Sequence, residues 1–170
     1  TGRWSSSSNA WGSGTNLQNI TPELRRMFVS DPGKKLGYLD LEQAESRVVG
    51  LLVWQKIGDA SYLDACESGD LHTTVARLVW TNKNWTEDFR KNKEIAEELF
   101  YRHFSYRDMA KRGGHGTNYF GTPRTMARHL KVEEKVMHGF QENYCGVKAP
   151  GGAFPGIRLW HAWIKTELQR

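Results

Sequence analysis

One glycine-rich segment constrains the fold of this chain more than any other. Residues 107–123 read RDMAKRGGHGTNYFGTP, and their pattern predicts a helix over residues 106–121 that contains Gly113, Gly114 and Gly116. Each glycine inside a helix costs roughly 1 kcal/mol relative to alanine, so another requirement must outweigh that loss. We expect the glycines to leave room for a substrate or for a neighbouring backbone, although glycines also mark helix bends.

The composition is that of a folded protein. The chain has 170 residues, of which 38% are apolar and 12% aromatic, and its formal net charge is +5. This moderately basic balance suits a polyanionic partner without requiring one. No apolar run is long enough to cross a membrane and no signal-peptide pattern opens the sequence. We therefore predict an intracellular, cytoplasmic protein with no membrane partner.

The cysteines and histidines do not form a metal-binding pattern. Cys66 and Cys145 lie far apart and belong to no CxxC or Cys/His spacing, so we expect reduced, buried thiols. The six histidines show no paired ligand spacing either. A zinc protein is consequently the weakest of the alternative readings.

The predicted fold class is α+β and predominantly helical. The apolar run LGYLDL at 36–41 indicates a buried strand, followed directly by a helix that starts near Gln43. Thr86 is the expected N-cap of a later helix. Helices are expected at about 60–67, 70–80, 87–104 and 106–121, with one or two more within 123–145 and a last one at the end of the chain. Residues 1–20 have the composition of a flexible linker.

A small group of carboxylates follows the predicted strand. Strand alternation puts Asp40 and Glu42 on one face, and the start of the helix brings Glu45 beside the end of the strand. Mg²⁺ takes oxygen ligands and commonly one or two carboxylates plus substrate phosphates. An isolated DxE is more often an ordinary pair of surface charges, so this pattern by itself is weak.

The glycine-containing helix carries a basic stripe. Arg107, Lys111, His115 and Tyr119 are spaced four apart and share one broad face. Two cations one turn apart can bind successive phosphates, and an aromatic ring further along can pack on a sugar or a base. The stripe therefore fits a nucleoside triphosphate laid along the helix. The competing interpretation is an amphipathic helix with a solvated basic surface.

Five motifs together resemble the family A DNA polymerases, those similar to bacterial DNA polymerase I and its phage relatives. TGRWSS with NLQNI resembles the family's TGRLSS and NLQNIP, and DLEQAESR resembles its first palm motif, DYSQIELR. GDLHTTVA resembles GDIHTxTA, RDMAKRGGHGTNYFG resembles the fingers helix RxxxKxxxFGxxYG, and FPGIRLW resembles FPGVxxY. These motifs keep the family's order from the first residue almost to the last.

The resemblance implies a fragment of a right-hand polymerase fold. Residues 1–80 would be a partial palm with the DNA-binding segment and the first catalytic motif. Residues 81–150 would be the fingers with the nucleotide-binding helix, and residues 151–170 the start of the return toward the palm. The source would be a bacterium or a phage-infected cell.

The resemblance also implies catalytic and metal-binding roles. Asp40 would hold the Mg²⁺ pair, with the Leu41 carbonyl as a further ligand. Two such ions stabilise the attacking and leaving oxygens of a phosphoryl transfer. Lys111 would also be catalytic, as a general acid on the pyrophosphate.

The implied substrate contacts fall into two groups. The expected nucleotide-binding residues are Arg107, Lys111, His115, Tyr119, Glu45 and Gln43, with Glu45 excluding a ribose 2′-hydroxyl. Arg47 matches a further position of the Glu45 motif, where support of the site is expected. The expected contacts to primer-template DNA in its minor groove are Arg3, Asn16 and Gln18.

The sequence departs from the family pattern at several positions. His115 stands where the family has Phe or Tyr, which introduces a titratable ring beside the incoming sugar. Gly113 and Gly114 replace larger residues, and Phe120 stands where Gly is common. Leu41 and Glu42 replace Tyr and Ser, and Glu42 either adds a metal contact or faces water.

The family's second catalytic aspartate belongs to a His-Asp-Glu motif, and that triplet does not occur in the chain. The chain also starts with Thr1 and ends inside a predicted helix, so we expect a piece of a longer polymerase that supplies the remaining palm, thumb and exonuclease parts. The isolated piece is expected to be inactive. The alternative readings are an inactive nucleotide or nucleic-acid-binding module derived from a polymerase, and a phage-type single-subunit RNA polymerase.

Overall fold

The structure is a computed structural model that describes residues 21–37 and 41–169. The chain divides into two compact units, Thr1–Asp40 and Leu41–Arg170. In the first unit, the single-turn helix α1 (Pro22–Arg25) follows Thr21, whose carbonyl accepts hydrogen bonds from the N–H groups of Leu24 and Arg25.

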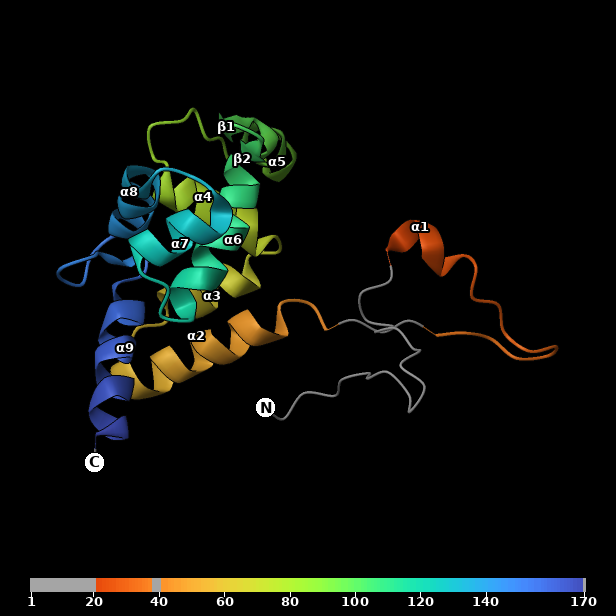
Figure 1. The fold of residues 1–170 in the computed structure, drawn as a ribbon, viewed down its shortest axis with the longest axis horizontal. Coiled ribbons are helices and arrows are strands. Elements are labelled where there is room, and N and C mark those ends of the chain that lie inside the picture. The colour runs from red at the N-terminus through yellow and green to blue at the C-terminus, as the bar shows by residue number, and fades with distance from the viewer. Residues whose placement is uncertain (1–20, 38–40, 170) are drawn as a thin grey trace. The chain divides into compact units, whose positions relative to one another are not determined.

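The second unit is mostly helical and has one β-hairpin (Figure 1). Its strands pair antiparallel, with Leu99 opposite Ser105 and Tyr101 opposite Phe104. Its elements are α2 (Ala44–Ile57), α3 (Ser61–Glu67), α4 (Leu71–Val79), α5 (Phe89–Glu97), β1 (Leu99–Tyr101), β2 (Phe104–Ser105), α6 (Tyr106–Asn118), α7 (Pro123–Leu130), α8 (Glu134–Cys145) and α9 (Pro155–Leu168). The predicted α+β, predominantly helical class is thereby confirmed.

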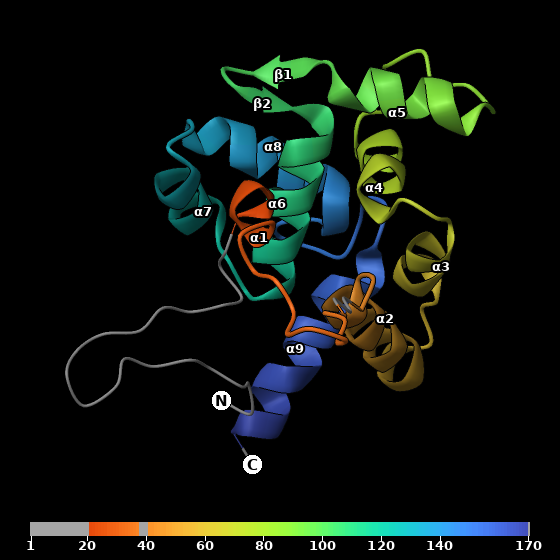
Figure 2. The same ribbon diagram turned by 90° about the vertical axis from the view of Figure 1, so that its right-hand side faces the viewer.

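Helix α6 is central to the packing of this unit, because it contacts α4, α5, α8 and both strands. Met109 and Ala110 of α6 are fully buried, as are Val75 and Ala76 of α4. Figures 1 and 2 both draw α9 beside α2, at the end of the unit opposite the hairpin. One buried core contains Met109 of α6 together with Val53 of α2 and Ile157 of α9, near the beginning and the end of the unit.

Polar side chains start four of the helices. In each case the residue before the helix accepts a hydrogen bond from a backbone N–H of the first turn, which satisfies a group that has no partner inside the helix. These residues are Asp70 before α4, Asp88 before α5, Ser105 before α6 and Thr122 before α7. Asp88 rather than Thr86 is therefore the N-cap of α5, and the prediction of Thr86 was wrong.

The helix predicted over 87–104 is also wrong in its second half. Helix α5 ends at Glu97, and a hairpin follows in which Arg102 adopts a left-handed φ of 53°. Phe100 packs on Trp80 and Tyr106, with ring centroids 4.9 and 5.0 Å away. The aromatic residues after Glu97 favour strands, and this packing outweighs the helical pattern. Of the predicted strand 36–41, residues 38–40 lie outside the described residues, and the described ones are not in a strand.

The glycines of α6 make room for side chains of the neighbouring helices. A Cβ on Gly113 would lie 2.6 Å from Cε1 of Phe140 in α8, and one on Gly116 would lie 2.6 Å from Cε of Met126 in α7. A Cβ on Gly114 would meet the Tyr144 ring at 3.4 Å. The helix runs unbroken through all three positions. The prediction that these glycines leave room for a substrate or a neighbouring backbone was therefore wrong, because aromatic and methionine side chains fill that space.

Asp59 joins the start of α9 to the start of α3. Its Oδ1 accepts from the Ser61 N–H at 2.9 Å, and its Oδ2 accepts from the Gly156 N–H at 2.7 Å. Burial disfavours the charged carboxylate, but the hydrogen bonds from Ser61 and Gly156 outweigh it and lower the pKa of Asp59. A charged Asp59 therefore fixes α9, which contributes Trp160 to the pocket described below.

We expect Gly113→Ala and Gly139→Ala to change stability in opposite directions. Gly113→Ala should lower the free energy of unfolding by about 1–3 kcal/mol, because the new methyl group overlaps the Phe140 ring. Gly139→Ala, in α8 with no atom within 4 Å of the new Cβ, should raise it by about 0.4–1 kcal/mol. Urea unfolding of both variants measures this, and stabilisation by Gly113→Ala would contradict the packing.

We expect Asp59→Asn to destabilise the protein by about 1–3 kcal/mol at neutral pH, since an amide cannot accept both hydrogen bonds. The pKa of Asp59 is lowered below its ordinary 3.8 in the folded state, so its contribution is complete above that pH and is lost as the pH falls through the folded pKa. Urea unfolding between pH 7 and pH 2.5 should show the difference from wild type shrinking. Asp64→Asn, an exposed position in α3, is the control.

Candidate nucleotide-binding site

The basic stripe predicted on the glycine-containing helix lies on one side of α6. Lys111, His115 and Tyr119 are exposed, and Arg107 is half-buried. Gly113 is about 200° round the helix from both Lys111 and His115, because each residue advances by about 100°. The packed face and the polar face are therefore on opposite sides of the same helix.

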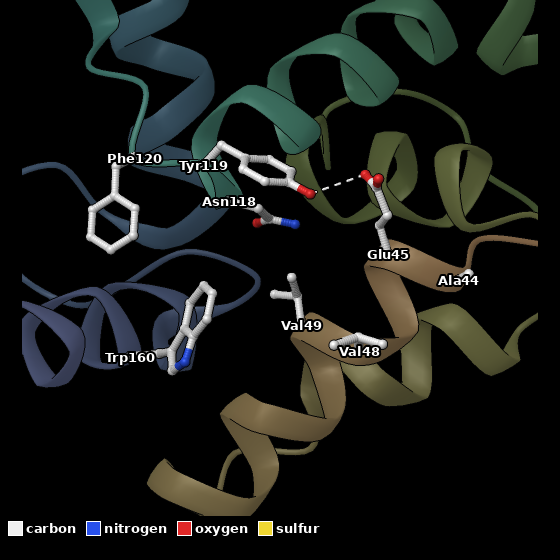
Figure 3. Close-up of a pocket in the computed structure, with 8 residues that line it drawn as sticks. All are labelled: Ala44, Glu45, Val48, Val49, Asn118, Tyr119, Phe120 and Trp160. Carbon is white, nitrogen blue, oxygen red and sulfur yellow. Dashed lines mark hydrogen bonds between the residues drawn. The ribbon is translucent and has the colours of Figure 1, made fainter. Parts of the chain in front are cut away.

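Tyr119, His115 and Glu45 come together across 74 positions of sequence. The Tyr119 hydroxyl donates to Glu45 Oε2 at 3.0 Å (Figure 3). Nδ1 of His115 lies 4.0 Å from the same oxygen. The His115 and Tyr119 rings are 4.8 Å apart between centroids. The structure thus joins two of the motifs singled out in the sequence, one at the start of α2 and one at the end of α6.

A pocket of about 360 Å³ opens beside this contact. Figure 3 shows Tyr119 and Glu45 at one edge, Val48 and Val49 on the α2 side, and Phe120 and Trp160 on the other side. The pocket is lined by Ala44, Glu45, Val48, Val49, Asn118, Tyr119, Phe120 and Trp160. Its walls are largely apolar, with a carboxylate and a phenol at the rim, which suits a flat or sugar-bearing ligand with a few polar groups.

A buried polar cluster holds the end of α6. Asn118 Nδ2 donates to the Tyr62 hydroxyl at 2.9 Å, and the Tyr144 hydroxyl donates to Asn118 Oδ1 at 2.9 Å. Nε2 of His161 lies 3.2 Å from the Asn118 carbonyl. Burial raises the pKa of Tyr144 and lowers the pKa of His161, so both are neutral at pH 7. Local sequence patterns do not predict this cluster, because its members come from four different helices.

Phe120 has a backbone conformation that glycine adopts more easily. Its φ is 64°, in the left-handed region. This agrees with the sequence comparison, in which Phe120 stands where the polymerase motif that it resembles commonly has Gly. The ring stacks on His161, with centroids 4.1 Å apart. This stacking offsets the backbone strain and forms one wall of the pocket, while the change of direction ends α6 at Asn118.

Arg107 is paired with Asp70, the N-cap of α4. Arg107 Nε donates to Asp70 Oδ2 at 2.8 Å and Nη2 donates to Oδ1 at 3.2 Å. Burial disfavours the charged Asp70, but hydrogen bonds, above all from Arg107, outweigh it and lower the pKa of Asp70. Asp70 belongs to the GDLHTTVA motif, but the sequence alone indicates no role for it.

His72 is a second site residue that the sequence analysis missed. Burial lowers its pKa from 6.5 to about 4, and the cations Arg107, Lys111 and His115 add to the shift although Asp70 opposes it. His72 is therefore neutral at pH 7. The sequence motif GDLHTTVA contains His72. The lowered pKa of His72, however, depends on the packing of α6 against α4, which brings Arg107, Lys111 and His115 near its ring.

The residues around the first palm-like motif are only partly described. Gln43 has a left-handed φ of 54°, and its Nε2 donates to the Gly69 carbonyl at 3.1 Å. Among the described residues, its buried Oε1 has no hydrogen-bond partner. Arg47 pairs with Glu67 and donates from Nε to the Glu42 carbonyl at 3.3 Å, which supports this turn. Leu41 and Glu42 are exposed.

Other predicted site residues lie outside the described part of the chain. These are Asp40, Arg3, Asn16 and Gln18, so their roles stay predictions. Within residues 21–37 and 41–169, no three His, Cys, Asp or Glu side chains gather where they could hold a metal ion. Cys66 and Cys145 are free and buried as predicted, and burial raises the pKa of each thiol to about 11. No helix in the described ranges is long and apolar enough to span a membrane.

We expect the His72 ring to stay unprotonated until about pH 4 in an NMR titration of the histidine side chains. Its neutral form stabilises the fold fully above pH 6.5, and that contribution is lost as the pH falls toward 4. Lys111→Ala should raise the midpoint, because Lys111 is one of the cations that disfavour protonation. Arg112→Ala, one position further along α6, should leave it unchanged. A midpoint near 6.5 in the wild type would contradict the buried position.

The chain is similar to a DNA polymerase I. The polymerase of Aquifex aeolicus (strain VF5) is 25% identical over 155 residues, which cover 91% of this chain and 24% of the relative. The chain therefore spans about a quarter of the length of the curated relative that it matches. No family model and no solved structure matches the chain. The similarity supports a distant, polymerase I-like relationship along most of the sequence.

Proposed function

We propose that this chain is the central palm and fingers segment of a template-directed DNA polymerase, which adds deoxynucleoside triphosphates to a primer 3′ end. The observation that carries the proposal is the hydrogen bond from Tyr119 to Glu45. It joins two motifs whose residues the polymerase resemblance assigns to one nucleotide site. The similarity to a DNA polymerase I over 91% of the chain supports the same proposal.

In this proposal the nucleotide lies along the polar face of α6. Arg107 and Lys111 are one turn apart and contact its phosphates, while His115 and Tyr119 face its sugar and base. Glu45, next to Tyr119, excludes a ribose 2′-hydroxyl. Lys111 gives a proton to the departing pyrophosphate, and the buried cluster around Asn118 keeps Tyr119 in position.

The metal and DNA contacts of the proposal involve residues outside the described ranges. Asp40 and the Leu41 carbonyl would hold Mg²⁺, with a second carboxylate supplied by a part of the enzyme beyond this chain. When bound, the metal pair neutralises the charge that develops on the phosphates. Arg3, Asn16 and Gln18 would contact the primer-template near the primer terminus.

The proposed division assigns residues 1–80 to the palm, 81–150 to the fingers and 151–170 to the return toward the palm. The enzyme would need the remaining palm and the thumb, with an exonuclease part where the parent polymerase proofreads. It would act in DNA replication or repair in the cytoplasm of a bacterium or a phage-infected cell.

A chimaeric polymerase tests the proposal. Residues 1–170 replace the matching segment of the Aquifex aeolicus DNA polymerase I, and primer extension is measured with deoxynucleotides and Mg²⁺. We expect extension that Asp40→Ala abolishes. Lys111→Ala should slow it by about a hundredfold or more, since it removes a phosphate contact and a general acid. Glu45→Ala should increase the incorporation of ribonucleotides relative to deoxynucleotides.

Arg112→Ala is the matched control, because Arg112 is an exposed cation on the same helix but off the polar stripe. It should change extension less than about twofold, as expected for a surface charge away from the site. A folded chimaera that binds primer-template and adds nothing would favour an inactive binding module instead. Extension that survives Asp40→Ala would overturn the catalytic assignment.

A further inference from the structure

We propose that Asp70 is a positioning residue of the nucleotide site. It holds one edge of the Arg107 guanidinium so that the opposite edge is presented to a phosphate. The inference rests on the proposed function, since it assigns a task within the same site. The resemblance assigned Arg107 to the triphosphate and left Asp70 without a role.

The geometry of the pair supports a fixed guanidinium. Two parallel hydrogen bonds of 2.8 and 3.2 Å join Nε and Nη2 of Arg107 to the two oxygens of Asp70. The side chain of Asp70 is 14% exposed and that of Arg107 is 28% exposed, so solvent competes little for either group. A bidentate pair of this kind fixes orientation as well as distance.

The donor count of arginine leaves one edge for a ligand. A guanidinium has five N–H groups, one on Nε and two on each terminal nitrogen. Asp70 takes the Nε hydrogen and one hydrogen of Nη2. The two hydrogens of Nη1 and the second hydrogen of Nη2 form the other edge, which has the geometry for a bidentate phosphate contact.

Asp70 is itself fully occupied and therefore well held. Besides Arg107, it accepts from the His72 N–H at 3.1 Å and from the Thr73 hydroxyl at 3.0 Å. These four hydrogen bonds use about all the lone-pair positions that a carboxylate offers. The pair thus connects α4 to α6, and Arg107 is held in place before any ligand arrives. This arrangement reduces the ordering that binding a phosphate would otherwise require.

Asp70 is also a counter-charge to Arg107, and this charge effect on the affinity for a triphosphate is opposite in sign to the effect of positioning. Asp70 cancels much of the charge of Arg107, so its removal alone would strengthen the attraction for a triphosphate. Positioning predicts the opposite sign, because without Asp70 the guanidinium loses its two parallel hydrogen bonds and keeps, within the described residues, only the 3.7 Å contact from Nε to Glu97 Oε1. The direction of the change in affinity therefore decides between a positioning residue and a mere counter-ion.

The test measures the affinity of the chain for deoxyadenosine triphosphate and for inorganic triphosphate by calorimetry. We expect Asp70→Asn to weaken binding of both probes by about tenfold, a factor within the range for coupled polar pairs. Asparagine is as good an N-cap as aspartate, so α4 should keep its start. Asp88→Asn is the matched control, since Asp88 caps α5 in the same way and is not paired with an arginine in the described structure.

The arginine side of the pair supplies a second variant. Arg107→Lys keeps the positive charge but lacks the planar fork, so it should also weaken both probes by about tenfold. Adding Asp70→Asn to Arg107→Lys should cost little more, because the two residues act as one unit. Thermal unfolding of each variant accompanies the measurements. A merely structural Asp70 would lower the melting temperature without this non-additive loss of affinity.

Two other binding results would contradict the positioning role of Asp70. Binding that Arg107→Lys weakens and Asp70→Asn leaves unchanged or strengthens would overturn the positioning role and leave the proposed nucleotide site intact. A wild-type chain that binds neither probe would overturn the nucleotide site, and the positioning role with it.

Discussion

The close contact of α6 with α7 and α8 is the constraint on which the rest of the unit depends. Gly113 and Gly116 have no side chain, so Phe140 and Met126 reach the helix backbone. The loss of helix propensity, about 1 kcal/mol for each glycine, is offset by this burial. Because one face of α6 is packed so tightly, its other face is held rigidly, and that face carries Lys111 and the rest of the polar stripe.

Two kinds of anchoring fix the polar face at its two ends. At the start of α6, Arg107 is tied to α4 through Asp70 by a partly buried ion pair. At its end, Asn118 is tied to Tyr62 and Tyr144 by buried hydrogen bonds. Such bonds are strong in a low-dielectric interior, and losing one partner leaves a buried group unsatisfied. The stripe between the two anchors therefore keeps a defined orientation toward α2.

The similarity to a DNA polymerase I gives this arrangement a chemical context. In the proposed nucleotide site, the exposed Lys111 supplies positive charge at one end, and a pocket of about 360 Å³ lies beside the Tyr119–Glu45 contact at the other. A nucleoside triphosphate has the complementary arrangement, with its charge at one end and its sugar and base at the other.

The polar stripe, the order of the motifs and the approximate positions of most helices could be predicted from the sequence alone, because these depend on local periodicity. The helix ends could not, since Asp88 rather than Thr86 caps α5 and that helix ends at Glu97. Three further features depend on tertiary packing: the hairpin after Glu97, the side chains against the glycine face of α6 and the partner of Arg107. These depend on which side chains meet across long stretches of chain: Phe140 fits against Gly113, and Asp70 reaches Arg107 from 37 positions away. Local sequence patterns do not predict such contacts, because the energies of burial and of side-chain pairing arise only when the helices pack together.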